Sequence, residues 1–208
     1  FSYKKCTSIR SYTPKPTLKL DKVAAAAEII NNAKKPMIIF GQGIILSEAE
    51  AELKALIEKS GIPAAWTILG LSALPTDHPL NVGMVGMHGN YGPNVLTNEC
   101  DVLIALGMRF DDRVTGNLAT YAKQAKVIHV EIDPAEIDKN VKTTVAVLAD
   151  LKEALTALIP LVEKNNHDSW HNEFKEKYKI ELEKVIDEEL KPNHEGISMG
   201  ETIEMINK

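Results

Sequence analysis

The chain has 208 residues, with 24 Lys and Arg against 29 Asp and Glu, a formal charge of -5 and a hydrophobic content of 44%. This composition is typical of a folded, soluble protein and excludes collagen-like and intrinsically disordered chains. The acidic balance offers no basic surface for neutralising phosphates, so we expect no nucleic-acid partner. The longest apolar stretches are far shorter than the ~20 residues of a membrane-spanning helix, so we expect no membrane association.

The two cysteines, Cys6 and Cys100, lie far apart and form neither a CxxC pair nor a cysteine–histidine cluster with metal-ligand spacing. We therefore predict no metal site in this chain and a reducing compartment, with the cytoplasm as its location. The chain begins with Phe1 and carries no signal-peptide pattern. We interpret it as a part of a longer protein.

The first third of the chain predicts an extended segment followed by alternating helices and strands. Residues 1–20 are polar and interrupted by proline, which predicts a lead-in without regular structure. Asp21 is expected to cap a helix that ends before Pro36, and the apolar run 37–40 predicts a buried strand.

The next helix is predicted from its two ends. Ser47 and Glu50 have the spacing of a capping box, and Gly61 is placed to end the helix. The apolar run 62–67 then predicts a second strand.

Three further apolar runs predict strands at 102–106, 127–132 and 145–148. Asp133 followed by proline predicts a helix start after the second of these strands, and Asp150 is expected to cap a helix after the third. Nearly continuous apolar strands separated by helices are typical of a parallel sheet covered on both faces. We therefore predict an α/β fold, a doubly wound, Rossmann-like parallel sheet with helices on both faces.

From residue 163 the sequence is densely charged and carries a thin thread of apolar residues, which predicts a helical connector. The connector either lies across its own domain, the interpretation we favour, or binds a partner. Ser198 and Glu201 have capping-box spacing for a last helix, which we interpret as the beginning of another domain. The sequence thus divides into a lead-in, a central domain and a linker, at 1–20, 21–162 and 163–208.

Ligands of a doubly wound sheet bind beyond the carboxyl ends of its strands. Three predicted strand ends have suitable residues: Gly41 to Gly43, Gly107 to Arg109, and the pair Glu131 and Asp133. Glycines let the backbone approach a phosphate, and a carboxylate suits ribose hydroxyls. Short glycine turns are also common for purely structural reasons.

Two dense segments lie between the strands. Residues 83–92 hold four glycines around His88, which predicts a loop with unusual backbone angles that either approaches a ligand or makes a tight crossover. Residues 107–116 hold two arginines and two aspartates, which either form a salt-bridged turn or present guanidinium groups to a pyrophosphate. His129 lies in an apolar strand and is interpreted as a satisfied core residue. No catalytic arrangement follows from the spacing.

These two segments, GMVGMHG at 83–89 and RFDDRVTG at 109–116, together resemble the central domain of the acetolactate synthase (acetohydroxyacid synthase) catalytic subunits. Supporting motifs include HVEIDPAEI at 129–137, and the resemblance covers residues 20–160 well. Ser72 stands where relatives often have glycine, a change that we expect to be tolerated.

The resemblance implies a thiamine diphosphate enzyme that joins a two-carbon unit from pyruvate to pyruvate or 2-oxobutyrate, in branched-chain amino-acid synthesis. It also implies that the central domain holds FAD without a net redox role for the flavin. The FAD contacts that it implies are Gly41, Gln42, Gly43, Thr67, Ile68, Val85, Gly86, Met87, His88, Gly107, Met108, Arg109, Asp111, Arg113, Val114, Glu131, Ile132, Asp150 and Leu151.

By the same resemblance, Met87, His88, Asp112 and Arg113 line a substrate channel where inhibitors bind. The catalytic Glu of the family belongs to an N-terminal domain, and its Gly-Asp-Gly motif for magnesium and thiamine diphosphate belongs to a C-terminal domain. We therefore expect no catalytic or metal-binding residue in this chain and no activity of the chain alone. A homodimer or homotetramer of the full subunit, with a possible small regulatory subunit, is the implied assembly.

Two other classes of function compete with this interpretation. The first is the middle domain of another thiamine diphosphate enzyme, of the glyoxylate carboligase or pyruvate oxidase type. The second is a noncatalytic module that binds a nucleotide or mediates assembly.

Overall fold

The computed structural model describes residues 2–5, 13–190 and 196–207. In this part of the chain, six parallel strands form one sheet in the order β3-β2-β1-β4-β5-β6. This is the strand order of the Rossmann fold, so the predicted α/β class and doubly wound sheet are confirmed. The strands are β1 (Pro36–Phe40), β2 (Ala64–Trp66), β3 (Asn81–Met84), β4 (Val102–Leu106), β5 (Lys126–Glu131) and β6 (Val145–Leu148).

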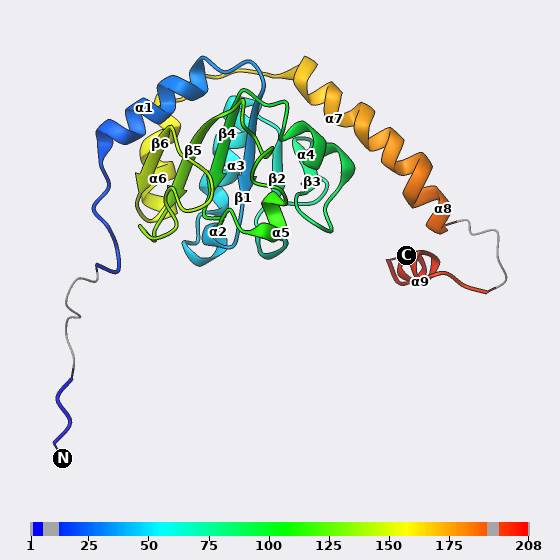
Figure 1. Ribbon diagram of the computed structural model, residues 1–208, viewed down its shortest axis with the longest axis horizontal. Helices are drawn as coiled ribbons and strands as arrows, with labels where there is room; N and C mark the ends of the chain where they lie inside the picture. The colour runs from blue at the N-terminus through cyan, green and yellow to red at the C-terminus, as the bar shows by residue number, and fades with distance from the viewer. Residues whose placement is uncertain (1, 6–12, 191–195, 208) are drawn as a thin grey trace.

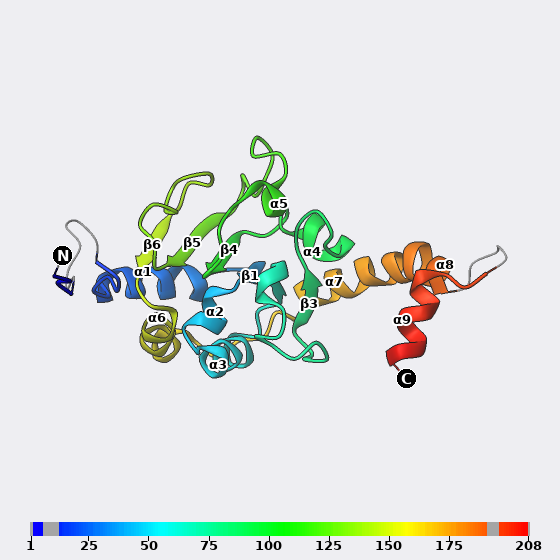
Figure 2. The same cartoon turned by 90° about the horizontal axis from the view of Figure 1, so that it is seen from below.

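The central strands are buried on both faces, which is why they read as continuous apolar runs. In β1, Ile38 and Phe40 face one core, whereas Met37 and Ile39 face the other. The first core is closed by α1 (Leu20–Asn31), α3 (Glu50–Ser60) and α6 (Leu151–Leu158). The second core is closed by α4 (Tyr91–Leu96) and α7 (Asp168–Glu181). Figure 2 shows α3 and α6 on one side of the sheet and α4 on the other.

Short elements complete the described chain. They are α2 (Gly43–Leu46), η1 (Ile68–Gly70), α5 (Asp112–Thr115), η2 (Ile159–Leu161), the π-helical turn η3 (Leu182–Ile186), α8 (Asp187–Leu190) and α9 (Met199–Asn207). α7, η3 and α8 follow one another without a break and extend beyond the sheet, and α9 lies beside α8 (Figure 1). Within the described residues, no helix is long and apolar enough to span a membrane.

Three predicted helix ends are confirmed by their capping geometry. Gly61 ends α3 in the left-handed conformation, with φ of 67°. The Asp150 carboxylate accepts a hydrogen bond from the Lys152 amide at the start of α6. Ser198 and Glu201 bond reciprocally at α9: the Ser198 amide donates to the Glu201 carboxylate at 2.8 Å, and the Glu201 amide donates to Ser198 Oγ at 3.0 Å.

Two predicted helix starts near the amino terminus are wrong by two residues. Lys19, and not Asp21, is the N-cap of α1. Asp21 lies in the first turn, where its negative charge interacts favourably with the positive end of the helix dipole. Ser47 forms no capping box with Glu50, because it ends the short helix α2, and α3 begins only after Ala49.

No helix begins at Asp133, because local side-chain bonds hold residues 133–143 in turns. The Asp133 carboxylate accepts a hydrogen bond from the Ala135 amide at 2.9 Å. Asp138, with φ of 59°, accepts from both the amide and the hydroxyl of Thr143, at 2.7 and 3.0 Å.

The glycine-rich segment is only partly a loop. Gly83 belongs to the edge strand β3, which the sequence did not predict. The following turn is held by two asparagines. Asn90 accepts a hydrogen bond from the Met84 amide at 2.8 Å, and Asn94 bonds both the amide and the carbonyl of Gly86, at 2.8 and 2.9 Å.

The connector packs on its own domain along its first half. Trp170 and Phe174 of α7 belong to the second core, with exposures of 2% and 3%. Further along, Tyr178 is 51% exposed and Val185 is 55% exposed. The favoured interpretation therefore holds along α7, because at its end the Glu181 carboxylate accepts hydrogen bonds from the Asn90 side-chain amide at 3.0 Å and from the Tyr91 amide at 3.1 Å. Cys100 is buried with a free thiol, whereas Cys6 lies outside the described residues.

Candidate functional site

A cavity of about 610 Å³ lies at the carboxyl ends of the strands, where β1 is flanked by β2 on one side and β4 on the other. β2 and β3 lie on one side of β1, and β4, β5 and β6 lie on its other side, so the strand order switches direction between β1 and β4. Open α/β sheets bind ligands at this switch point, and we call this space the switch-point cavity. Most of the predicted FAD contacts line this one cavity: Gln42, Gly43, Thr67, Ile68, Gly107, Met108, Arg109, Asp111, Arg113, Val114, Glu131, Ile132, Asp150 and Leu151.

The glycines after β1 and β4 allow two main-chain segments to touch. A Cβ on Gly41 would lie 2.6 Å from the Gly107 carbonyl oxygen, and a Cβ on Gly43 would lie 2.6 Å from Gly107 Cα. The Gly43 amide donates to the Gly107 carbonyl at 3.0 Å, so this amide is engaged within the protein and is not offered to a phosphate. The close approach of the two turns is therefore enough to explain why these positions are glycine. The turns form part of the wall of the cavity.

The arginines after β4 form weak ion pairs and remain accessible. Arg109 lies 3.6 Å from Asp111, and Arg113 lies 3.9 Å from Asp112, with the two arginine side chains 63% and 73% exposed. Exposed pairs of this kind contribute about 0–1 kcal/mol. Asp111 also caps α5 by accepting a hydrogen bond from the Arg113 amide. The salt-bridged turn exists, and both guanidinium groups can still bind an anion in the cavity.

Two carboxylates line the opposite side of the cavity. Glu131 is 8% exposed, and its Oε1 accepts hydrogen bonds from the Ile132 and Asp133 amides at 2.8 and 3.2 Å. Asp150 caps α6 and lies 3.3 Å from the ammonium group of Lys15. A buried carboxylate with one oxygen held by amides can accept hydrogen bonds from hydroxyl groups through its other oxygen.

The remaining predicted contacts, Gly41, Val85, Gly86, Met87 and His88, do not line this cavity. Met87 instead contacts the channel residue Arg113. Its amide donates to the Arg113 carbonyl at 2.7 Å, and its Sδ lies 3.9 Å from the Arg113 guanidinium. The predicted channel residues Met87, His88, Asp112 and Arg113 are all exposed, and Arg113 also lines the cavity.

Five lining residues were missed by the sequence analysis: Lys15, Leu46, Ser47, Leu69 and Ala149. Ser47 and Lys15 carry the missed polar groups. Ser47 was assigned to helix capping, and Lys15 was assigned to the lead-in, whose path along the sheet edge has no sequence signal.

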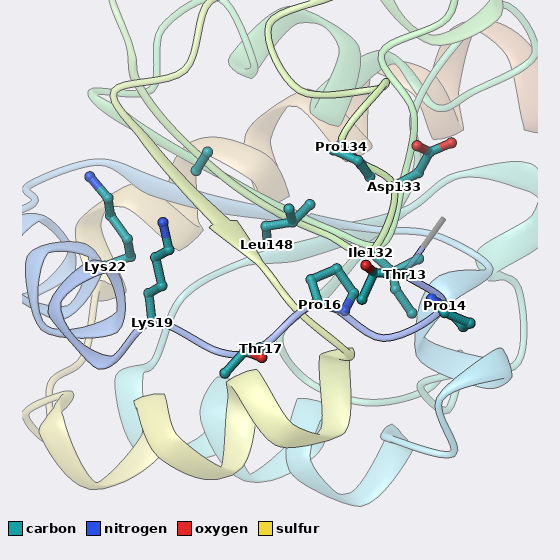
Figure 3. Close-up of a pocket in the computed structure, with 11 residues that line it drawn as sticks. Thr13, Pro14, Pro16, Thr17, Lys19, Lys22, Ile132, Asp133, Pro134 and Leu148 are labelled. Carbon is teal, nitrogen blue, oxygen red and sulfur yellow. The ribbon is translucent and has the colours of Figure 1, made fainter. Parts of the chain in front are cut away.

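A second cavity of about 830 Å³ lies between the lead-in and the edge strand β6 (Figure 3). In this view Pro16 of the lead-in lies beside Ile132 and Leu148. The second cavity shares Ile132 with the first. Its charged groups are Lys19, Lys22 and Asp133. We assign the candidate site to the switch-point cavity, because it is lined by Gly43, Gly107, Arg109, Arg113 and Glu131.

His129 lies in β5 beneath the candidate site and is fully buried. Its Nε2 donates to the Met108 carbonyl at 2.9 Å, because a carbonyl can only accept, whereas its Nδ1 has no partner among the described residues. The predicted core histidine is thus satisfied at one nitrogen only. Burial lowers the pKa of His129 below its ordinary value of 6.5, and the bond to Met108 and the nearby Glu131 partly oppose this shift.

We expect the stability of the protein to fall as the pH is lowered through about 6.5 and toward the folded pKa of His129. In this window the unfolded chain binds more protons than the folded one, so the free energy of unfolding rises with pH. The side chain in His129→Gln cannot titrate. The free energy of unfolding, measured with urea at about pH 7 and at about pH 5.5, should therefore differ less in this variant than in the wild type. His167 and His171, whose pKa values are also lowered by burial, remain in both proteins and cancel in the comparison. An unchanged dependence in the variant would contradict this assignment.

A six-stranded parallel sheet in the Rossmann order, with a cavity at its switch point, defines a domain of the doubly wound α/β class. Comparison with known families gives a narrower result. The family described as thiamine pyrophosphate enzyme, central domain, matches residues 23–158. The chain belongs to this family.

Curated relatives agree with the family. The chain is 39% identical over 201 residues to the probable acetolactate synthase large subunit of Methanocaldococcus jannaschii, covering 95% of this chain and 34% of that protein. It is 42% identical over 156 residues to the acetolactate synthase isozyme 1 large subunit of Escherichia coli, covering 75% of this chain and 27% of that protein. The chain thus spans about a third of the first relative and less of the second.

Proposed function

We propose that this chain is the central domain of an acetolactate synthase catalytic subunit and that its switch-point cavity holds FAD. The observation that carries the proposal is the gathering of most residues that the resemblance assigned to FAD around a single cavity. Similarity to acetolactate synthase large subunits along 95% and 75% of the chain supports the enzyme class.

The donor set of the cavity fits a dinucleotide. Glu131 would accept hydrogen bonds from ribose hydroxyls, and Arg109 and Arg113 would neutralise the pyrophosphate. Asp150, at the amino terminus of α6, would lie on the adenosine side, as the resemblance implies. When bound, FAD would supply a flavin ring that the resemblance implies takes no net part in redox chemistry.

The complete subunit would act on 2-oxoacids with thiamine diphosphate and magnesium, which the resemblance places in other domains. Under this proposal the lead-in (1–20) and the linker (163–208) connect the central domain (21–162) to those domains. The assembly would be a cytoplasmic homodimer or homotetramer, with a possible regulatory subunit.

The activity test uses pyruvate, magnesium and thiamine diphosphate. We expect the complete subunit to form acetolactate, to lose this activity when FAD is removed and to regain it when FAD is restored. The 208-residue chain alone should give no acetolactate above a protein-free blank. Activity that needs no FAD would point to a flavin-free relative, and no acetolactate at all would favour a carboligase of another 2-oxoacid or a noncatalytic module.

A further inference from the structure

Two side chains outside the cavity hold the segment that presents Arg109. Nε2 of the buried His129 donates to the Met108 carbonyl at 2.9 Å. Nδ2 of Asn140, in the turns after β5, donates to the Phe110 carbonyl at 2.6 Å. The two carbonyls belong to the residues immediately before and after Arg109, so the backbone on each side of this arginine is fixed by a side-chain donor.

The ring of His129 fixes the same segment by packing. It meets the Phe110 ring edge-on, with centroids 5.0 Å apart, and Phe110 in turn packs edge-on against Tyr121 at 6.2 Å. Met108 itself lies close to the first strand turn, because a Cβ on Gly41 would come within 2.7 Å of Met108 Cβ. A shift of Met108 would therefore disturb two walls of the cavity.

The guanidinium of Arg109 is held less firmly than its backbone. Its ion pair with Asp111 spans 3.6 Å, and its side chain is 63% exposed. The orientation of the Arg109 side chain therefore depends on the backbone from Met108 to Phe110, which the bonds from His129 and Asn140 hold in place. A flexible cation binds an anion better when its backbone is fixed beforehand, because less freedom is lost on binding.

We infer that His129 and Asn140 are positioning residues that hold Arg109 for an anionic ligand of the switch-point cavity. The ligand class is a nucleoside diphosphate or dinucleotide, and the identification of FAD as the probe rests on the proposed function. Neither residue lines the cavity, and both bond the carbonyls next to Arg109. His129 Nε2 also lies 3.9 Å from Oε2 of the cavity residue Glu131, which is too far for a hydrogen bond.

The test uses variants of His129 that differ in which ring nitrogen they replace. The amide nitrogen of Gln takes the place of Nε2, and that of Asn takes the place of Nδ1, so only Gln can reach the Met108 carbonyl. In the complete subunit we expect His129→Asn to weaken FAD binding about fivefold to tenfold and His129→Gln to stay within about twofold of the wild type. Equal losses in both variants, or no loss in either, would overturn the inference.

Asn140→Ala supplies a variant at an exposed position, where folding is not at risk. It should weaken FAD binding about threefold to tenfold by removing the donor to the Phe110 carbonyl. In an Arg109→Ala background, neither His129→Asn nor Asn140→Ala should weaken binding more than about twofold further, because residues that act through one another are not additive. Additive losses would show a general structural role and contradict the positioning role.

A readout without FAD separates this inference from the proposed function. Hydrogen exchange of peptides that contain residues 105–110 should accelerate in His129→Asn and Asn140→Ala and should be restored in His129→Gln. If the wild type binds no FAD but the variants show this exchange pattern, only the proposed ligand is refuted. If exchange in the variants accelerates uniformly along the whole chain, the positioning role of His129 and Asn140 is refuted.

Discussion

Gly107→Ala is expected to abolish ligand binding at the switch-point cavity and to destabilise the fold. Gly107 has φ of 56°, a conformation that costs alanine about 1–2 kcal/mol. A Cβ there would also meet Leu151 Cδ1 and would lie 2.7 Å from Gly43 Cα. Overpacking of this kind adds about 1–3 kcal/mol, and relief of the clash would push the turns after β1 and β4 apart.

Gly116 provides the matched control. It has the same φ of 56°, but nothing lies within 4 Å of a Cβ placed there. Gly116 has ψ of -122°, outside the left-handed helical region, so Gly116→Ala should cost only a conformational part of about 1–3 kcal/mol in urea unfolding. It should leave FAD affinity within about threefold of the wild type. Equal losses of FAD affinity in the two variants would show that the close approach of the two turns is unimportant.

Trp170→Ala is expected to destabilise the protein by about 3–5 kcal/mol, the usual cost of removing a buried tryptophan. Trp170 is 2% exposed, and its indole nitrogen donates to the Pro36 carbonyl at 2.8 Å. Its ring packs edge-on against Phe174 at 4.9 Å and lies 4.7 Å below the ammonium of Lys35. The residue ties α7 to the start of β1.

Tyr178→Ala on the same helix is the control for Trp170. Tyr178 is 51% exposed, so its removal should change the free energy of unfolding by less than about 0.5 kcal/mol. Urea unfolding of both variants checks the expectation. A Trp170→Ala protein as stable as Tyr178→Ala would mean that α7 does not pack on this domain and would favour its alternative role as a partner-binding helix.

The strands were predictable where burial on both faces made the sequence continuously apolar. β1, β4 and β5 follow from such runs. β6 is an edge strand whose burial alternates, and it was predictable because all four of its residues are apolar. β3 was missed because it is an edge strand of intermediate burial that contains Gly83. α2 was missed because a helix of 4 residues without a side-chain cap leaves no periodic pattern.

Local turn chemistry explains the other differences. At 133–143 the sequence favoured a helix, but Asp133 and Asp138 bond to backbone amides nearby and hold turns instead. Ser72 has φ of 78°, a conformation that favours glycine, so the glycine that the resemblance leads us to expect there would suit this position.

The site was predictable to the extent that it lies at strand ends, because parallel strands bring their carboxyl ends to one edge of the sheet. Gly107, Glu131 and Asp150 illustrate this rule. Lys15 was not predictable, because it reaches Asp150 from a lead-in that carries no periodic pattern. The bonds from His129 and Asn140 to the carbonyls on either side of Arg109 were also not predictable, because every residue has a backbone carbonyl and the sequence does not show which one accepts.

The flavin site in the switch-point cavity is tested by titrating the complete subunit with FAD, with NAD as competitor and with Gly107→Ala as the negative control. We expect saturable FAD binding that NAD does not displace, and loss of this binding in Gly107→Ala while Gly116→Ala still binds. Displacement of FAD by NAD, or equal FAD binding by wild type and Gly107→Ala, would contradict a flavin site in the switch-point cavity.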